Sequence, residues 1–189
     1  MRIAVYPGSF DPLHIGHKAI LEYLTGEASF EAVYLVVYPQ NPFKDPSKAL
    51  NARKRYEAAV AAVARFPELR VKVDDIELGM DPPNYTIRTL DALKAREPDN
   101  SFTLVIGADN LEGLPRWRCA RRILTDYEIV VYPRPGYDSE ALLEVLREYC
   151  RKRHIRCNVT LINAPQVDIS STAIRKGLAK GRDMSGFLM

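Results

Sequence analysis

Cysteine, net charge and long apolar runs are all scarce in this sequence. Its three cysteines, Cys119, Cys150 and Cys157, are an odd number without Cys-x-x-Cys spacing, which argues against a disulfide framework or a zinc cage and suits a reducing compartment. No stretch approaches the ~20 apolar residues that span a bilayer, and the first residues lack a signal-peptide layout. We therefore expect a cytoplasmic protein without a membrane partner.

The charges of the chain are nearly balanced. Lysine and arginine number 27 and aspartate and glutamate 24, which gives a formal net charge of +3 and does not indicate a nucleic-acid-binding protein. We interpret the basic run within residues 147–156 as the solvated end of a helix and the loop after it. A chain of 189 residues is long enough for one ordinary α/β domain.

Apolar runs alternate with segments of helical periodicity along the whole chain. The expected strands cover residues 3–7, 32–38, 70–75, 102–107, 127–132 and 158–162. The expected helices cover residues 14–25, 51–65, 85–96, 117–125, 138–150 and 171–179. This alternation predicts an α/β fold with a doubly wound parallel sheet and helices on both faces. Ligands bind such sheets at the carboxyl ends of the strands, so the turns there are the candidate sites.

The helix expected at residues 51–65 has the clearest amphipathic pattern. Asn51 is its expected N-cap. One stripe of its surface carries the apolar residues Ala52, Tyr56, Ala59, Val60 and Val63, which we expect to face the core.

Residues 8–17, Gly-Ser-Phe-Asp-Pro-Leu-His-Ile-Gly-His, join the first strand to the first helix. Backbone N–H groups in the first turn of a helix lack intrahelical acceptors and carry the positive end of the dipole, so this turn is a candidate phosphate site. His14 and His17 lie three residues apart on one helix face, where their rings add to that positive field, and Gly16 leaves room for a ligand. The alternative is that the two histidines are surface or capping residues.

The turn resembles the signature of the nucleotidyltransferase superfamily that carries a His-x-Gly-His motif. Its members transfer a nucleotidyl group from ATP or CTP to a phosphate-bearing acceptor, and the motif does not select the acceptor. The resemblance implies a Rossmann-like fold of the nucleotidyltransferase type. We expect a single domain over residues 1–189, in which the segment 165–189 closes the ATP site.

Five further polar or aromatic residues lie in the turns and at helix starts that follow the strands. Lys44 is the one charge of a proline-stiffened loop and, taken alone, is a solvated surface residue. Asn84 is a candidate helix cap, with Thr86 in the first turn. Asp109 is placed to accept hydrogen bonds from ribose hydroxyls, with a plain turn aspartate as the alternative. Trp117 is either a core anchor or a surface on which an aromatic ring stacks.

The segment Ile-Ser-Ser-Thr-Ala-Ile-Arg, residues 169–175, opens the last helix. Ser171 and Thr172 offer hydroxyls and free N–H groups, a second anion site. Arg175 opposes the helix dipole at a cost of a few tenths to about 1 kcal/mol unless an anion lies beside it. A surface salt bridge is the alternative explanation.

Five ordered segments are similar to bacterial nicotinate-nucleotide adenylyltransferases. Besides residues 8–17 and 169–175 they are Tyr-Thr-x-x-Thr-Leu at 85–90, Ile-Gly-x-Asp-x-Leu at 106–111 with Pro-x-Trp at 115–117, and Arg-Pro-Gly-Tyr at 134–137. The sequence departs from this family at Pro7, where a glycine is usual, and at Phe43, where a histidine is frequent.

This resemblance implies transfer of the adenylyl group of ATP to nicotinate mononucleotide, giving deamido-NAD and pyrophosphate. The acceptor is already a phosphate oxyanion, so positioning and charge neutralisation suffice without a nucleophilic side chain. Mg²⁺ is expected on the ATP phosphates, without a preformed metal site in the protein. ATP and nicotinate mononucleotide are the expected partners, and a homo-oligomer is left open.

The resemblance also implies roles for the matching residues. The catalytic residues would be His14 and His17 on the α- and β-phosphates, with Lys44 and Arg175 on the leaving pyrophosphate. The ATP-binding residues would be Gly8, Ser9, Phe10, Asp109, Arg134, Ser171 and Thr172. The acceptor-binding residues would be Tyr85, Thr86, Trp117 and Arg118, with the nicotinate ring stacked near Trp117 and its carboxylate on backbone N–H groups around Thr86 and Arg118.

Three alternatives stay open at the level of the sequence. A pantetheine-phosphate adenylyltransferase has the same chemistry but lacks the segments at 85–90 and 115–117. A nicotinamide-nucleotide adenylyltransferase would differ in its acceptor, since an amide offers less negative charge to the same donors. A non-catalytic nucleotide-binding sensor is disfavoured because His14, His17, Lys44 and Arg175 are all present.

Overall fold

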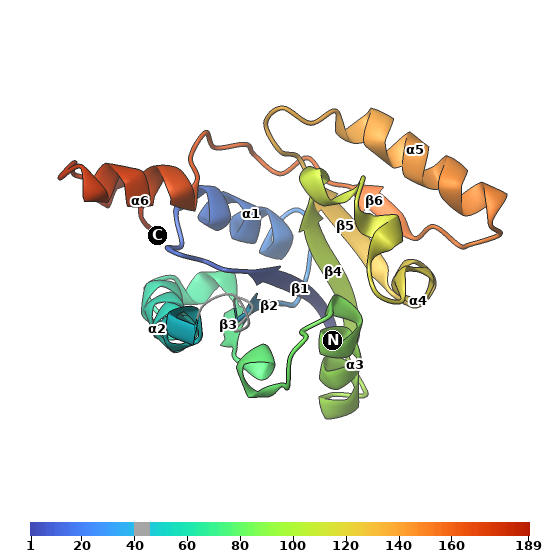
Figure 1. Ribbon diagram of the computed structural model, residues 1–189, viewed down its shortest axis with the longest axis horizontal. Coiled ribbons are helices and arrows are strands. Elements are labelled where there is room, and N and C mark those ends of the chain that lie inside the picture. Colours follow the sequence, from blue (N-terminus) through green and yellow to red (C-terminus); the bar gives the residue numbers. More distant parts are fainter. Residues whose placement is uncertain (40–45) are drawn as a thin grey trace.

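The computed structural model describes residues 1–39 and 46–189, and for residues 46–50 it describes the backbone alone. Within these residues six strands form one parallel sheet in the order β3-β2-β1-β4-β5-β6 (Figure 1). The strands are β1 (Arg2–Gly8), β2 (Ala32–Val37), β3 (Val71–Asp74), β4 (Ser101–Gly107), β5 (Glu128–Tyr132) and β6 (Val159–Leu161). The helices are α1 (Ile15–Thr25), α2 (Pro46–Val63), α3 (Thr86–Arg96), α4 (Ala120–Asp126), α5 (Ser139–Lys152) and α6 (Ser171–Ala179). The predicted doubly wound parallel sheet is confirmed.

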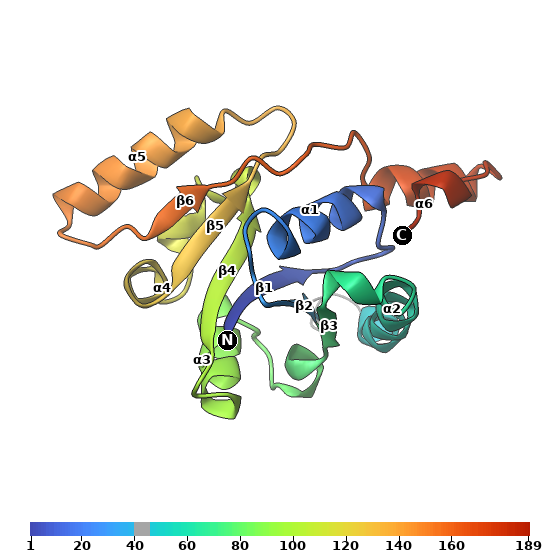
Figure 2. The ribbon, with the colours of Figure 1, turned by 180° about the vertical axis from the view of Figure 1, so that it is seen from behind.

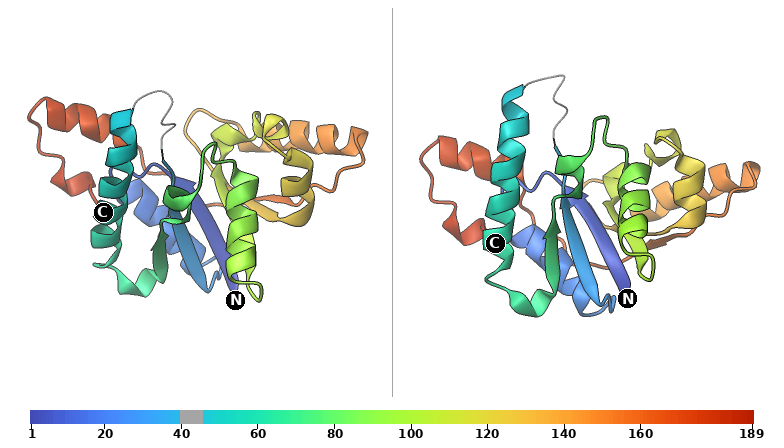
Figure 3. Two further views of the ribbon diagram at one scale, coloured as in Figure 1. Left: turned by 60° about the horizontal axis from the view of Figure 1, so that its bottom comes forward. Right: turned by 90° about the horizontal axis from the view of Figure 1, so that it is seen from below.

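The two faces of the sheet bury separate sets of apolar side chains. Alternate residues of a strand point to opposite faces, so in β1 Ile3 and Val5 join the core beneath α3, α4 and α5, whereas Ala4 and Tyr6 join the core beneath α1 and α2. Figures 2 and 3 show this division, with α2 and α3 on opposite sides of β1 and β2. Both faces of the central strands are therefore covered, as a parallel sheet requires.

The predicted helix at 51–65 is wrong at its start. Helix α2 begins at Pro46, which is possible because a proline is tolerated in the first turn of a helix. Asn51 therefore lies inside the helix and is not its N-cap. Val60 is 41 % exposed, contrary to the predicted stripe, while Arg55 is buried.

The predicted helix at 117–125 also starts later than expected. Residues 114–116 form a single 3₁₀ turn, and Cys119 adopts a left-handed backbone with φ +55° directly before α4 begins at Ala120. Trp117 consequently precedes the helix, with extended backbone. The other expected elements match the observed ones to within two residues at their ends, and the helix expected at 171–179 matches α6 at both ends.

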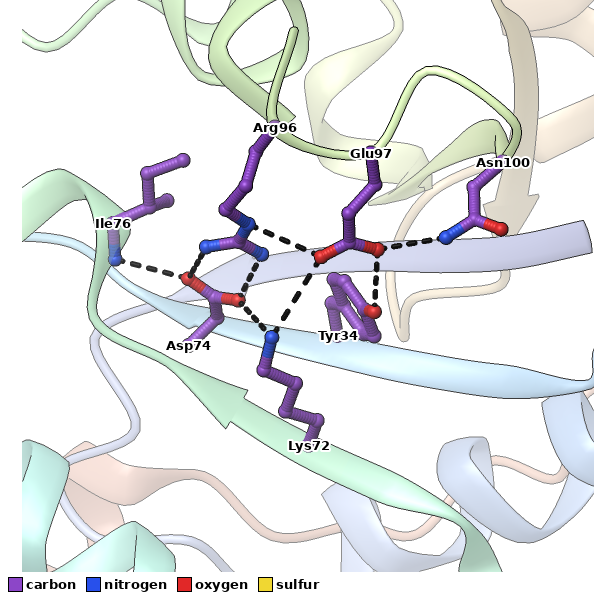
Figure 4. Close-up of polar contacts among 7 residues, drawn as sticks. All are labelled: Tyr34, Lys72, Asp74, Ile76, Arg96, Glu97 and Asn100. Atoms are coloured by element: carbon purple, nitrogen blue, oxygen red, sulfur yellow. Dashed lines mark hydrogen bonds and ion pairs between the residues drawn. The ribbon is translucent and has the colours of Figure 1, made fainter. Parts of the chain in front are cut away.

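A charged network ties the end of α3 to β2 and β3 (Figure 4). The Asp74 carboxylate is 2 % exposed and accepts two hydrogen bonds from Arg96, at 3.1 and 2.5 Å, and one from the backbone N–H of Ile76. Lys72 lies 3.3 Å from the same carboxylate. Burial alone would raise the pKa of Asp74, but the Arg96 and Lys72 charges outweigh it and hold the pKa below its usual value.

This network holds α3 against the sheet at the end opposite to its first turn. Glu97 extends it, since its carboxylate contacts Arg96 and Lys72 and accepts a hydrogen bond from Tyr34 of β2 at 2.7 Å. The network involves no residue of the predicted site.

Among the helices of the described ranges, none combines the length and the apolar composition that crossing a bilayer takes.

Asp74→Asn is expected to lower the free energy of unfolding by about 1–3 kcal/mol at pH 7, because it removes the buried carboxylate that accepts two hydrogen bonds from Arg96. The matched control is Asp75→Asn, which breaks the exposed Arg53 pair and should cost about 0–1 kcal/mol. Because the folded state lowers the pKa of Asp74, the difference between wild type and Asp74→Asn is present above about pH 4 and shrinks as the pH falls below it. Urea titrations from pH 3 to pH 7 measure both effects; equal losses in the two variants would contradict this role for the network.

Candidate active site

A cavity of about 590 Å³ opens at the carboxyl ends of the strands, where the strand order reverses between β1 and β4. This is the position at which doubly wound sheets bind their ligands, and the volume is that of a typical small-molecule site. The predicted site residues that line it are Gly8, Ser9, Phe10, His14, His17, Thr86, Asp109, Trp117, Arg134, Ser171, Thr172 and Arg175. The structure thus brings together segments up to 167 positions apart in the chain (175 − 8).

Two predicted residues are not part of this wall, and a third lies outside the described residues. Tyr85 is the N-cap of α3, is 42 % exposed and does not line the cavity. Arg118 is exposed and also lies off the lining. Lys44 lies outside the described residues, as does Phe43, so the structure does not test them.

The two imidazoles are oriented by backbone hydrogen bonds at the start of α1. His14 Nδ1 accepts from the N–H of Gly16, and His17 Nδ1 accepts from the N–H of His14, both at 3.2 Å. The rings stack with their centroids 3.7 Å apart. Since a nitrogen that accepts a hydrogen bond carries no proton, each neutral ring holds its proton on Nε2, which is left as a donor for the cavity.

Both histidines are neutral at pH 7. Burial, followed by the charge of Arg134, lowers the pKa of His14 to about 4. Burial, followed by the charges of His14 and Arg134, lowers the pKa of His17 to about 3. The rings can therefore add to the positive field of the turn only as neutral hydrogen-bond donors and not as cations.

The capping interpretation of this histidine pair is confirmed, while its role in binding a ligand stays a prediction. His14 is the N-cap of α1, and its side chain accepts a hydrogen bond from the N–H of Gly16. That N–H is therefore not free to bind an anion, contrary to the prediction. The Nε2–H groups of the two rings remain as possible donors to a ligand in the cavity, since His14 and His17 both line it.

Distant segments hold the carbonyl oxygens of the turn that follows β1. Arg55 Nη1 donates to Ser9 O at 2.6 Å, and Arg175 Nη1 donates to Asp11 O at 2.6 Å. The hydroxyl of Ser171 donates to Pro12 O at 3.0 Å. The N–H of Met189 donates to the carbonyl oxygen of Leu13 at 3.3 Å, and Leu188 forms a bridge with His14. The turn is therefore shaped by α2, α6 and the last residues.

Phe10 packs its ring against the histidine pair through His17. Its backbone is left-handed, with φ +46°, which is uncommon for a bulky residue and holds here because the ring is buried. The ring packs edge-on against His17 and Tyr6, with centroid distances of 5.3 and 5.4 Å. A Cβ atom at Gly8 would lie 2.6 Å from this ring, so glycine is needed at that position.

Asp109 and Arg134 face each other on the rim of the cavity, with Arg134 Nε 3.4 Å from Asp109 Oδ1. Asp109 stands in the 3₁₀ turn after β4 and Arg134 follows β5. A Cβ at Gly107 would clash with the Asp109 carboxylate and would lie 3.1 Å from both Tyr132 and Arg134. The pair is half-exposed, so both side chains retain groups for a ligand.

Two further segments contribute to the cavity wall, namely the start of α3 through Thr86 and the residue after the 3₁₀ turn at 114–116, Trp117. Trp117 also packs against the core under α3 and α4, so it is both a core residue and a cavity residue. The alternative of Asn84 as a helix cap is wrong, because its Nδ2 donates instead to the carbonyl oxygen of Glu77 at 3.0 Å.

Glu77 is a wall residue that the sequence did not indicate. It is 5 % exposed, and its carboxylate accepts a 2.6 Å hydrogen bond from the buried hydroxyl of Thr89. Burial raises the pKa of Glu77, against the lowering effect of that bond. Other unpredicted lining residues are Tyr6, Tyr38, Asn110, Tyr132 and Ser170. Apart from the strand-end position of Tyr6 and Tyr132, no local pattern distinguishes them.

Within residues 1–39 and 51–189 no three histidine, cysteine, aspartate or glutamate side chains are grouped so that they could hold a metal ion. The donors that line the cavity are imidazole, guanidinium, hydroxyl and amide groups, with Asp109 and Glu77 as its carboxylates. Such a set fits an anionic ligand.

Comparison with known proteins gives consistent results. The family model described as cytidylyltransferase-like matches residues 5–177. A protein of Bacteroides fragilis named "probable nicotinate-nucleotide adenylyltransferase" is 36 % identical, over 99 % of this chain and 87 % of its own length. One of the same name from Cytophaga hutchinsonii is 37 % identical, over 93 % of this chain and 84 % of its own length.

A solved structure supports the fold. The nicotinic acid mononucleotide adenylyltransferase of Plasmodium falciparum, complexed with NaAD, superposes with a TM-score of 0.74, over 99 % of this chain and 90 % of that one. At 18 % sequence identity this likeness concerns the fold alone.

Nitrogen-detected NMR of the histidine rings is expected to show His14 and His17 as the Nε2–H tautomer at pH 7, still neutral at pH 5. Because their folded pKa values lie below the unfolded value near 6.5, the unfolded chain binds protons first on acidification. Their contribution to stability is thus full above about pH 6.5 and is lost as the pH falls toward 4 and then 3. A His154→Asn variant removes the third histidine, so that only the ring signals of His14 and His17 remain. A protonated ring at pH 6 in either residue would contradict the neutral Nε2–H form.

Proposed function

This chain belongs to the nicotinate-nucleotide adenylyltransferases, within the cytidylyltransferase-like family, and we propose that its cavity joins the adenylyl group of ATP to nicotinate mononucleotide. The products are deamido-NAD and pyrophosphate. The observation that carries the proposal is the convergence of three anion-binding elements on one cavity: the His14–His17 pair of α1, the turn after β1, and the start of α6 with Arg175.

The reaction is an in-line displacement at the α-phosphorus of ATP. An oxygen of the acceptor phosphate forms the new P–O bond as the bond to the β-phosphate oxygen breaks and pyrophosphate leaves. No protein nucleophile is needed, so the chain contributes position and charge stabilisation. Two Nε2–H donors suit this task, because each can donate a hydrogen bond to a phosphate oxygen while its ring stays neutral.

The proposed contacts follow the layout of the cavity. His14 and His17 donate to the α- and β-phosphates, while Gly8, Ser9 and Phe10 shape the turn beside them. Arg175 and the hydroxyl groups of Ser171 and Thr172 bind the β- and γ-phosphates and then the leaving pyrophosphate. Arg175 Nη2 already donates to Thr172 Oγ1 at 3.2 Å, which supports a joint role for the two side chains.

Lys44 completes this set in the proposal as a second cation for the pyrophosphate, on the strength of the family pattern alone. Mg²⁺, held by ATP oxygens and water, would supply further charge neutralisation. The described residues fit a metal that arrives with its ligand, since the cavity wall offers few carboxylates.

The segment 165–189 closes the ATP side of the cavity in this proposal. Its support is the set of bonds from Ser171, Arg175 and Met189 to the turn at residues 11–13. The rim pair Asp109 and Arg134 is proposed to bind the adenosine part of ATP, with the Asp109 carboxylate on the ribose hydroxyls.

The acceptor is proposed to bind against Thr86 and Trp117, with the nicotinate ring on the indole and its carboxylate on backbone N–H groups at the start of α3 and near Arg118. Backbone N–H groups donate hydrogen bonds whatever side chain the residue carries. The side chains of Tyr85 and Arg118 therefore need not line the cavity. A carboxylate gains more from such donors than an amide does, which favours the acid form of the acceptor.

Pyrophosphate release with ATP and Mg²⁺ is expected to be fastest with nicotinate mononucleotide, at least about tenfold above nicotinamide mononucleotide in kcat/KM, because one charged hydrogen bond is worth about that factor. Phosphopantetheine should give background release. Faster release with either rival would assign another acceptor, and no release with any of the three would favour a nucleotide-binding sensor.

His17→Ala is expected to lower kcat/KM by about 10²–10³, the usual effect of losing one donor to a developing oxyanion. His154→Asn is the matched control, a histidine remote from the cavity in a left-handed position that asparagine tolerates, and should leave the rate unchanged. Circular dichroism verifies that both variants fold. A folded His17→Ala enzyme with wild-type turnover would remove this residue from the mechanism.

A further inference from the structure

Arg55 is a buried arginine that belongs to none of the sequence motifs. It lies in the middle of α2 and is 6 % exposed. Its Nη1 donates to Ser9 O at 2.6 Å and its Nη2 to Tyr38 O at 3.1 Å. One guanidinium thus joins the ends of β1 and β2, at the edge where the cavity opens.

The charge of Arg55 is incompletely balanced. Its two hydrogen-bond acceptors are neutral carbonyl oxygens, and among the described residues it forms no ion pair with a carboxylate. Asp11 acts on it only from a longer distance, and burial, the larger effect, lowers the pKa of Arg55. A buried cation of this kind is stabilised when an anion binds nearby.

The bond to Ser9 also fixes the direction of the next peptide group. A peptide is planar and trans, so the carbonyl oxygen of one residue and the N–H of the following residue point in opposite directions. With Ser9 O held toward α2, the N–H of Phe10 points away from α2. Among the described residues this N–H has no acceptor, and both Ser9 and Phe10 line the cavity.

We propose that Arg55 is a positioning residue for the triphosphate of ATP: it turns the Phe10 N–H toward the phosphates and places a buried positive charge behind the turn. Arg55 does not line the cavity, so it acts through the peptide that it holds and through its field. This inference rests on ATP being the ligand of the cavity, but not on the identity of the acceptor.

The test compares Arg55→Met and Arg55→Lys with Arg53→Met, an exposed arginine two residues earlier on the same helix. Calorimetry without acceptor measures the Kd for ATP and, separately, for adenosine, which has no phosphates. We expect Arg55→Met to weaken ATP binding about 10- to 100-fold, the range for losing charged hydrogen bonds, and to change adenosine binding less than about twofold. Arg55→Lys, which keeps the charge but not the fork of two donors, should weaken ATP binding about tenfold. Arg53→Met should bind both ligands as the wild type does.

Two further readouts separate positioning from general damage. The KM for ATP should rise while the KM for nicotinate mononucleotide stays within about twofold, because Arg55 bonds to Ser9 and Tyr38 and not to Thr86 or Trp117, the residues proposed to bind the acceptor. The amide proton signal of Phe10 should move on adding ATP to the wild type, as expected for a new hydrogen bond to phosphate, and should move less in Arg55→Met.

Several outcomes would overturn the inference. Folded variants with an unchanged Kd for ATP would do so, as would equal weakening of ATP and adenosine, which indicates a purely structural role. Should Arg55→Met not fold, Arg55→Lys decides by the same criteria. If the wild type binds ATP through Arg55 but releases no pyrophosphate with nicotinate mononucleotide, the proposed function is wrong while the inference about Arg55 holds.

Discussion

The turn between β1 and α1 depends on having its carbonyl oxygens bound from outside. Ser9, Asp11, Pro12 and Leu13 each give their oxygen to a donor from another part of the chain: Arg55, Arg175, Ser171 or the last residue. For the trans peptide that joins Ser9 to Phe10, an oxygen held on one side presents the N–H on the other. Pro12 has no N–H, and the N–H of His14 donates to His17 Nδ1. At Phe10 the polarity of the cavity wall therefore depends on a hydrogen bond made behind that wall.

The histidine pair shows why a structural and a functional role need not compete. Capping the helix through Nδ1 is what fixes the tautomer and the direction of Nε2 in each ring. A histidine without that backbone bond would be free to present either nitrogen. The same burial that makes the rings neutral also keeps them from repelling the cations Arg134 and Arg175 that share the cavity.

The sequence predicted the sheet and the location of the cavity because both follow from local signals: apolar runs for strands, helical periodicity between them, and motifs at strand ends. The sequence did not predict the features that depend on a contact between segments far apart in the chain. Nothing near Arg55 indicates that its guanidinium is buried, and nothing near Glu77 indicates its bond to Thr89. Helix ends were missed where proline permits an earlier start, as at Pro46, or where a left-handed residue delays it, as at Cys119.

The bonds from α6 to the turn join residues 159 and 164 positions apart. Contacts of such sequence separation form late, since a long stretch of chain must be ordered before they are made. During synthesis on the ribosome, a chain that has emerged only as far as β6 can build the sheet but still lacks three of the four donors that shape the turn: Ser171, Arg175 and Met189. Nucleotide affinity should therefore be acquired at the last stage of folding, after the core is already in place.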